Sequence, residues 1–458
     1  MFKCIILKIL YHYKKTIFKV SVPKSLDMAC QYVGVIYKYQ IPIYNVIEIE
    51  NFLFRSIRKK VALSEISSID KDGILFVISE PYITGGHTRL MEVLSLMWPG
   101  KKEVLITRNC EGKAKERLGV YFDNISVCVR GSTEDSISYV LRLFEHIKSF
   151  KKVILNIHPD DIYLVLSCAL IKQLNKDVTI YFVNHADHVV TFGASIADFW
   201  FEISLYGREL DKNRGIFGVK SFLGIPINKD DENFFNKMQY PNIEKVKKFV
   251  TAGSAGKYKP FRGNSISPLI KAILRLNKNF TFIIIGPTLR NWWLFFLNRK
   301  FKGRIFIFNS LAHDEYIDLT QEGDYYVDSS PMPGGTAFVE QFMGGKPCIG
   351  LKTGFYGYTP LEKMKFEQID DVISLLKKPP THQDLSILQS EIYDVHSFTE
   401  VERRFQACII DGVVSDNPML SYSDDLVTNI EIPRRYGRLL LSKSFFIFKA
   451  LFSIAFNK

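Results

Sequence analysis

The sequence predicts an α/β protein with two doubly wound parallel sheets, each covered by helices on both faces. Two observations support this prediction. Short continuous runs of Val, Ile and Leu alternate with amphipathic segments, and this alternation occurs twice along the chain. With 458 residues, of which 47% are apolar and 14% aromatic, the chain is long enough for two to three folded domains.

Residues 73–240 are expected to form the first Rossmann-like domain. Its strand-like runs are continuous and apolar, and they lie at 73–79, 103–108, 125–130, 153–158 and 178–188. Amphipathic segments at 134–148 and 160–175 predict helices between them. Gly, Pro and an acidic cluster in 221–234 are typical of a linker, which we expect to join the two domains.

Residues 241–412 are expected to form a second domain of the same kind. Its predicted strands are 246–254, 280–286, 304–310, 324–330 and a run that begins at 347. Its predicted helices are 266–277, 313–320, 370–377, 383–392 and 398–412. This order of elements predicts two Rossmann-like domains that face a cleft.

Positive charge is concentrated at the two ends of the chain. The net charge is +12; residues 1–72 hold 12 Lys/Arg against 6 Asp/Glu, and residues 433–458 hold 6 against none. Residues 73–432 balance at 42 against 42. Since phosphate-backbone binding needs a concentrated basic surface, we expect no nucleic acid as a partner of the body.

Both basic ends are also apolar. In 413–458 the apolar run is about 12 residues, short of the roughly 20 that span a bilayer. Such a segment either lies in the interface of an anionic membrane or docks on the body as a helix. The extension 1–72 has an apolar stretch that Lys8 interrupts, with no small-residue cleavage site, so we expect a retained segment.

The chain has seven cysteines and no CxxC pair, which indicates reduced thiols. Together with the basic apolar ends, the reduced thiols predict a cytoplasmic protein at the inner membrane face.

The first candidate site follows the strand at 73–79. Gly85 and Gly86 allow close backbone approach to a ligand at the start of a helix, and His87 follows them directly. A histidine at this edge can act as general base on an acceptor hydroxyl, or it can serve only as a residue of the helix N-terminus.

A second cluster of polar residues closes the strand at 178–188. Asn184, His185 and His188 are expected on the acceptor side, and Asp187 is a candidate base. One short segment without a cysteine is a poor metal site, so no metal ligands are assigned.

The third candidate is the loop 251–259, TAGSAGKYK, after the first strand of the second domain. Small residues open the backbone at Ser254, and Lys257 and Lys259 supply positive charge for a diphosphate. The spacing does not match the phosphate loop GxxxxGK[ST], because Tyr258 follows Lys257. The alternative is a solvated basic loop.

The fourth candidate is the run DYYVDSSPMPGGTAFVEQFMGGKPCIG at 324–350. Gly334 and Gly335 precede a helix that begins near Thr336, and helix N-termini with accessible N–H groups bind phosphate oxygens. Glu340 lies one turn further on and can accept hydrogen bonds from ribose hydroxyls. The alternative is a capped helix whose glutamate pairs with a lysine.

The order of these motifs over residues 73–412 resembles the GT-B glycosyltransferases. The run from HDEYIDLT at 313–320 to the Gly-x-Pro that enters the next strand is similar to the donor-site region of that family. The loops at 85–87 and 251–259 occupy the places of its first cleft loop and its basic phosphate loop. Gly334-Gly335-Thr336 is also similar to the phosphate-binding Gly-x-Thr of O-GlcNAc transferase-like members.

The resemblance implies a metal-independent transferase without a cofactor. It would move a sugar from a nucleotide diphosphate donor, UDP-sugar being favoured, to a hydroxyl of a glycan or glycolipid acceptor such as a surface polysaccharide precursor. The sequence departs from the retaining pattern of two glutamates eight residues apart, because Met332 stands at the earlier position. Inverting chemistry with a His or Asp base stays open, as do a sugar-nucleotide epimerase and a non-catalytic partner protein of the same architecture.

Overall fold

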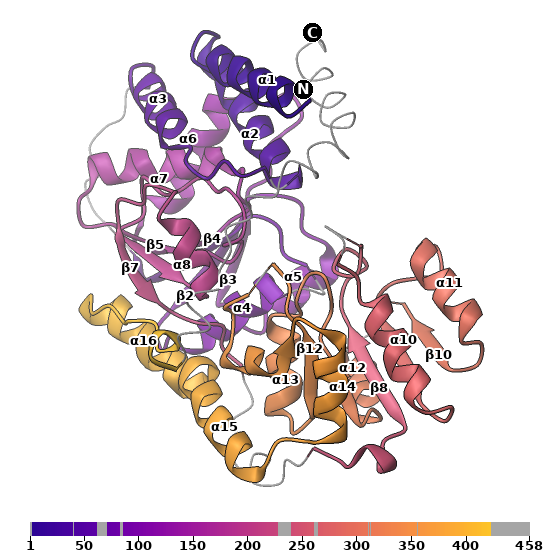
Figure 1. Ribbon diagram of the computed structural model, residues 1–458. Coiled ribbons are helices and arrows are strands. Elements are labelled where there is room, and N and C mark those ends of the chain that lie inside the picture. Colours follow the sequence, from indigo (N-terminus) through magenta and orange to yellow (C-terminus); the bar gives the residue numbers. More distant parts are fainter. Residues whose placement is uncertain are drawn as a thin grey trace. The chain divides into compact units, whose positions relative to one another are not determined.

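The computed structural model describes residues 2–39, 41–61, 71–82, 86–227, 240–260, 264–309, 311, 313–354 and 356–422. The chain divides into two compact α/β units (Figure 1). Among the described residues, the first unit runs to Gly224 and also takes in Glu402–Asn417, and the second comprises Ile225–Val401 and the short segment that follows Asn417. Gly85, residues 228–239 and the basic C-terminal segment from residue 423 lie outside the described residues.

The first unit contains a seven-stranded sheet in which every neighbouring pair is parallel. Its strand order is β3-β2-β1-β4-β5-β6-β7. The strands are β1 (Lys71–Ile78), β2 (Lys102–Ile106), β3 (Asn124–Val127), β4 (Phe150–Asn156), β5 (Thr179–Val183), β6 (Phe199–Glu202) and β7 (Val219–Phe222). The helices between them are α4 (Gly86–Leu96), α5 (Gly112–Leu118), α6 (Ser136–Ile147), α7 (Ile162–Leu174) and α8 (Leu205–Asp211).

The second unit repeats this plan with six parallel strands in the order β10-β9-β8-β11-β12-β13. The strands are β8 (Lys248–Ala252), β9 (Thr281–Ile285), β10 (Ile305–Phe308), β11 (Tyr325–Val327), β12 (Cys348–Leu351) and β13 (Lys365–Phe366). The α-helices are α10 (Ser267–Leu276), α11 (Trp292–Lys300), α12 (His313–Gln321), α13 (Thr336–Met343), α14 (Ile369–Lys377), α15 (His382–His396) and α17 (Met419–Tyr422). The predicted fold class is thereby confirmed: both sheets are parallel and doubly wound.

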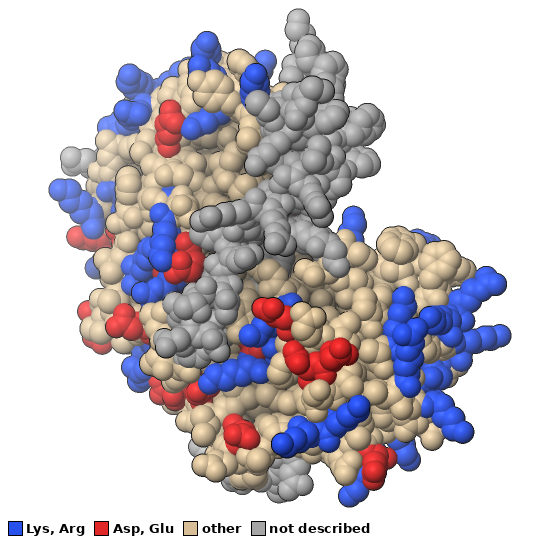
Figure 2. Space-filling view, viewed as in Figure 1, with Lys and Arg blue, Asp and Glu red and all other residues tan. Residues whose placement is uncertain are grey.

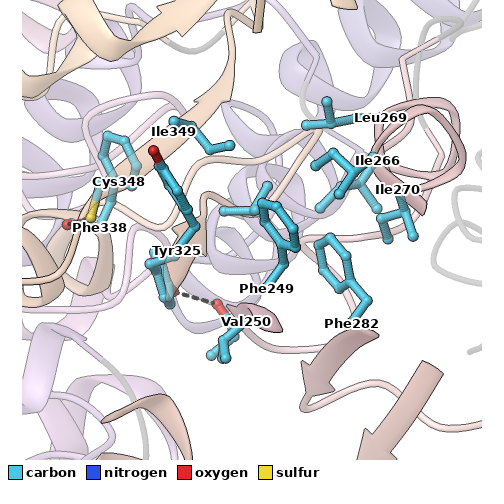
Figure 3. Packing of buried hydrophobic residues seen from close by; sticks show 14 of the residues in the cluster. Phe249, Val250, Ile266, Leu269, Ile270, Phe282, Tyr325, Phe338, Cys348 and Ile349 are labelled. Atoms are coloured by element: carbon cyan, nitrogen blue, oxygen red, sulfur yellow. Dashed lines mark hydrogen bonds between the residues drawn. The ribbon is translucent and has the colours of Figure 1, made fainter. Parts of the chain in front are cut away.

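Aromatic and branched aliphatic side chains form the hydrophobic core of the second unit (Figure 3). Phe249 of β8 lies at the centre, with ring centroids 5.4 Å from Phe280, 6.0 Å from Phe282 and 5.7 Å from Tyr325. All four side chains are buried. Because all these rings but Phe280, the residue just before β9, come from strands, burying them aligns β8, β9 and β11.

The N-terminal extension is helical and packs on the first unit. It forms α1 (Phe2–Ile17), α2 (Val22–Tyr39) and α3 (Ile47–Arg58), and α2 and α3 contact α6 and α7. Asp27 of α2 accepts hydrogen bonds from Arg130 at 2.7 Å, Ser136 at 2.6 Å and Tyr163 at 2.7 Å. Burial would raise the pKa of Asp27, but these donors hold it below its ordinary value.

Two features differ from the predicted organisation. The predicted linker 221–234 begins within β7, and β6 and β7 are additional strands of the first sheet. Helix α16 (Phe398–Asp411) crosses from the second unit to the first, where Arg404 donates to the carbonyl of Leu223 at 3.2 Å and Gln406 to that of Met97 at 2.8 Å. A helical pattern alone does not reveal which unit a terminal helix packs on.

No helix among the described residues combines the length and the apolar character that a membrane crossing requires. The six cysteines whose side chains are described, all but Cys4, are free, and four of them are buried.

Candidate functional site

The second sheet reverses its winding between β8 and β11. Parallel sheets of this kind bind ligands at the carboxyl ends of the strands, at the point of reversal. The loops that follow these two strands contact each other: the N–H of Met332 donates to the carbonyl of Lys257 at 3.2 Å, and Lys257 Nζ donates to the carbonyl of Pro333 at 3.1 Å. The structure therefore brings together two segments that lie about 75 residues apart in the sequence and that were both predicted to bind phosphate.

Lys257 is the cation at the junction of these loops. Its side chain is half-buried, and burial lowers its pKa, an effect that nearby Asp328 opposes and Lys365 reinforces. Ser254 and Lys259, from the same predicted set, are exposed. A half-buried lysine has fewer conformations to lose on binding an anion than an exposed one.

Two glycines shape the start of α13. Gly334 donates its N–H to Asp328 Oδ1 at 2.6 Å, and a Cβ at this position would lie 2.6 Å from the same oxygen. Gly335 has φ of +53° and forms the N-cap of α13 without a side-chain cap. Gly335 supplies no side-chain cap, and of the first turn the N–H of Ala337 donates to the carbonyl of Gly334 at 3.2 Å. The other N–H groups of this turn can bind an anion, which the helix dipole favours.

Thr336 and Glu340 lie on the first turns of α13. Both are half-buried, with Thr336 at the first helical position and Glu340 one turn further on. The prediction that a diphosphate lies at this helix start with a ribose beyond it therefore concerns two neighbouring turns of one helix.

A buried ion cluster that was not predicted supports this loop. Asp328, directly after β11, pairs with Lys365 of β13 at 2.7 Å, and Lys365 lies 3.7 Å from Glu362. The side chains of all three are at most 3% exposed. Lys365 also lies over the ring of Phe338 of α13, 4.5 Å from its centroid. Burial opposes the charge of Lys365, but Asp328 and Glu362 raise its pKa, so the lysine stays protonated.

The ion cluster holds the loop that connects β11 to α13. Asp328 Oδ1 accepts the N–H groups of Ser329 and Gly334, while its other oxygen faces Lys365. In the sequence, only Asp328 at the polar end of an apolar run indicated this cluster. Lys365 lies 37 residues further on and belongs to no motif.

In the first unit, His87 lies where the ends of β1 and β4 meet. Its Nε2 is 2.9 Å from the carbonyl oxygen of Glu80, and Asn156 at the end of β4 donates to the carbonyl of His87 at 2.8 Å. The ring of His185, after β5, stacks on His87 with centroids 5.5 Å apart, and Tyr82 packs edge-on at 5.0 Å. Residues at the ends of β1, β4 and β5 thus all contact His87.

The hydrogen bonds of His87 determine which nitrogen can take a proton. A carbonyl oxygen only accepts, so Nε2 carries hydrogen and Nδ1 holds the lone pair. Burial lowers the pKa of His87, although the Glu80 carbonyl opposes this effect. Burial together with His87 and His158 lowers the pKa of His185 to about 3. Both rings are neutral at pH 7, and a neutral His87 can accept a proton at Nδ1.

The structure does not favour Asp187 as a base. Its side chain is 1% exposed and accepts a hydrogen bond from Ser204, whose hydroxyl in turn caps α8 by accepting from the N–H of Gly207 at 2.8 Å. A Cβ on Gly207 would lie 2.6 Å from Asp187 Cβ. The carboxylate therefore joins β5 to α8 and is shielded from a substrate hydroxyl.

The three residues predicted on the acceptor side, Asn184, His185 and His188, have different surroundings. Asn184 is buried and donates to Asp211 at 3.4 Å, while His188 Nδ1 lies 3.7 Å from Asp187. Only His185 packs against His87. Within the described part of the chain, no group of three or more His, Cys, Asp and Glu side chains is arranged to hold a metal ion.

Solved structures with the same architecture are similar to this chain. HepE of Anabaena, solved in complex with UDP and glucose, matches with a TM-score of 0.53 at 13% identity over 74% of this chain and 100% of that chain. A mutant O-GlcNAc transferase of Thermobaculum terrenum matches with a TM-score of 0.51 at 11% identity over 87% of this chain and 81% of that one. No protein-family model and no curated sequence matches the chain. At these identities the similarity concerns the fold, and with two Rossmann-like units in this order the chain has the GT-B fold.

Proposed function

We propose that the protein is a glycosyltransferase that moves a sugar from a nucleotide diphosphate donor to a hydroxyl acceptor. The observation that carries the proposal is the half-buried Lys257, hydrogen-bonded to the loop that opens α13. A fixed cation beside an uncapped helix N-terminus suits a diphosphate, which is the leaving group of such a transfer. UDP is the favoured nucleotide, and the presence of UDP in the HepE structure supports that choice.

The donor is bound as a substrate and no cofactor is required. In this proposal Lys257 and Thr336 bind the diphosphate, with Ser254, Lys259 and the N–H groups near Gly335 around it. The carboxylate of Glu340 accepts hydrogen bonds from the ribose hydroxyls. The first-unit glycines Gly85 and Gly86 allow close approach of the donor's phosphates.

The chemical step needs a base for the acceptor hydroxyl. In the proposed mechanism Nδ1 of His87 takes that proton as the acceptor oxygen bonds to the anomeric carbon. The bond from that carbon to the phosphate oxygen breaks, and the nucleoside diphosphate leaves with the bonding electrons. Positive charge at Lys257 stabilises the charge that develops on the leaving group. His185 holds the imidazole of His87 in place by stacking.

The acceptor in this proposal is a lipid-linked glycan or another surface polysaccharide precursor at the inner face of the membrane. Basic apolar ends of the chain support contact with an anionic bilayer. Helix α1 exposes Leu7 and Tyr11 beside Lys8 and Lys15. The other basic end, 433–458, lies outside the described residues.

A turnover assay tests the proposal. The protein is incubated with UDP-, GDP- and CMP-sugars, each with and without a lipid-linked glycan acceptor, and the products are identified by mass spectrometry. We expect release of UDP and an acceptor heavier by one sugar. A new sugar-nucleotide isomer that forms without acceptor would instead identify an epimerase, and neither product nor nucleotide binding would identify a non-catalytic protein.

A further inference from the structure

The segment 264–309 of the second unit carries an unusual charge. It contains eight Lys and Arg residues and no Asp or Glu, although residues 73–432 as a whole are balanced. Six of the eight are exposed: Arg275, Lys278, Arg290, Arg299, Lys300 and Lys302. Figure 2 shows Lys and Arg without Asp or Glu at the right of the view, where Figure 1 draws α11 and β10.

Helix α11 within this segment exposes large apolar side chains. Trp292 is 67% exposed, Phe295 47% and Phe296 63%, and Arg299 completes the same face at the spacing i, i+3, i+4, i+7. Trp293, Leu294 and Leu297 are buried on the opposite face. The helix is therefore apolar on two sides, of which only one is covered by the described parts of the chain.

We propose that the α11 face, consisting of Trp292, Phe295, Phe296 and the basic residues Arg290, Arg299 and Lys300 around it, binds an anionic lipid surface. Tryptophan and phenylalanine are suited to the boundary between headgroups and acyl chains, and Lys and Arg attract anionic headgroups. The inference does not depend on the transferase assignment, because it rests on a different face of a different element.

The charge of this face selects the lipid surface over other occupants. A second copy of the face would bring like charges together, since no carboxylate lies within 264–309. The basic C-terminal segment 433–458, with six Lys/Arg and no acid, is repelled for the same reason. A nucleic acid would satisfy the charge, but a duplex offers the three aromatic rings no apolar layer. A single strand, whose bases stack on such rings, is the alternative that the test below separates from a lipid surface.

Tryptophan quenching tests the inference without interference from the basic ends. The chain has four tryptophans: Trp200 and Trp293 are buried, Trp98 is half-buried, and only Trp292 is exposed. The full-length protein is mixed with vesicles of equal parts phosphatidylcholine and phosphatidylglycerol that contain brominated lipid, which quenches tryptophan inside the bilayer. We expect quenching in the wild type, and we expect Trp292→Phe to abolish it while vesicle binding persists. Unchanged quenching in Trp292→Phe would overturn the proposal.

Vesicle sedimentation gives a second measurement. The double variant Phe295→Ser/Phe296→Ser should lower partitioning onto the anionic vesicles by about tenfold or more, because two exposed aromatic side chains no longer enter the interface. The control is Phe217→Ser, which changes a phenylalanine of the first unit that is 67% exposed, more than Phe295 or Phe296. An unchanged far-ultraviolet circular dichroism spectrum verifies that each variant is folded. Equal loss in the control, unchanged partitioning in the double variant, or equal binding to pure phosphatidylcholine would contradict the proposal, as would a Trp292-dependent dimer or nucleic-acid complex without vesicle binding.

Discussion

The carboxyl edges of the two sheets share one geometry and differ in chemistry. Both sheets reverse between their first and fourth strands, β1 and β4 in one unit and β8 and β11 in the other. At the first edge stand neutral imidazoles, His87 and His185, whose pKa values burial lowers. At the second edge stand the cation Lys257 and an uncapped helix start. The same fold position is therefore proposed to serve as a proton acceptor in one unit and as an anion site in the other.

The two edges also differ in how their candidate functional side chains are held in place. The second has a buried cluster of Asp328, Lys365 and Glu362 beneath the loop. At the first edge, His87 is held by stacking with His185 and by its hydrogen bond to the carbonyl of Glu80. Substitutions should therefore affect turnover at the first edge, and stability and donor binding at the second.

The largest effect is expected for His87→Gln, which removes the proposed base. Turnover should fall by about 10²–10⁴-fold while the dissociation constant for the donor stays unchanged. In the wild type, kcat/KM should fall as the pH drops through the lowered pKa of His87, because protonation removes the lone pair on Nδ1. The control Asp187→Asn should keep this acid limb, since Asp187 is bonded to Ser204. Full activity in His87→Gln would remove His87 from the mechanism.

The next effect is on stability. Lys365→Met leaves the carboxylates of Asp328 and Glu362 buried without their cation, and loss of one member of such a cluster costs about 3–5 kcal/mol. The free energy of unfolding is measured by urea denaturation. Lys363→Met is the matched control: Lys363 pairs with Glu391 at 2.6 Å and is 35% exposed, so its loss should cost only about 0–1 kcal/mol. Equal losses in the two variants would show that the cluster has no special role.

A smaller effect concerns acid stability of the first edge. His185 has a folded pKa of about 3, whereas an unfolded histidine titrates near 6.5. Between these values the unfolded state binds more protons, so stability is fully present above about pH 6.5 and declines as the pH falls toward 3. In His185→Gln the free energy of unfolding should depend less on pH in this window. An unchanged slope in denaturation at a series of pH values would contradict the assigned burial of His185.

The sequence predicted most of the strands and the order of the loops because buried parallel strands are continuous apolar runs. β6 and β7 escaped detection because neither is a run of Val, Ile and Leu: β6 is FWFE, and β7 is VKSF with two polar side chains. The sequence could not reveal the burial of Asp187 against Gly207, because that burial is a property of the packed fold. Lys365 could not be found because its partner Asp328 follows a strand that lies far from it in the sequence. The α11 face was missed because the charge balance over 73–432 conceals a local excess of Lys and Arg.

The central claim is that the edge formed by β8 and β11 binds a nucleoside diphosphate. Calorimetric titration with UDP tests it on the wild type, on Lys257→Met and on Lys247→Met, which removes an exposed lysine just before the amino end of β8. We expect UDP to bind the wild type and Lys247→Met equally, and Lys257→Met about 10–100-fold more weakly, as loss of a charged hydrogen bond to phosphate implies. No heat of binding in the wild type, or equal affinity in all three proteins, would contradict the claim.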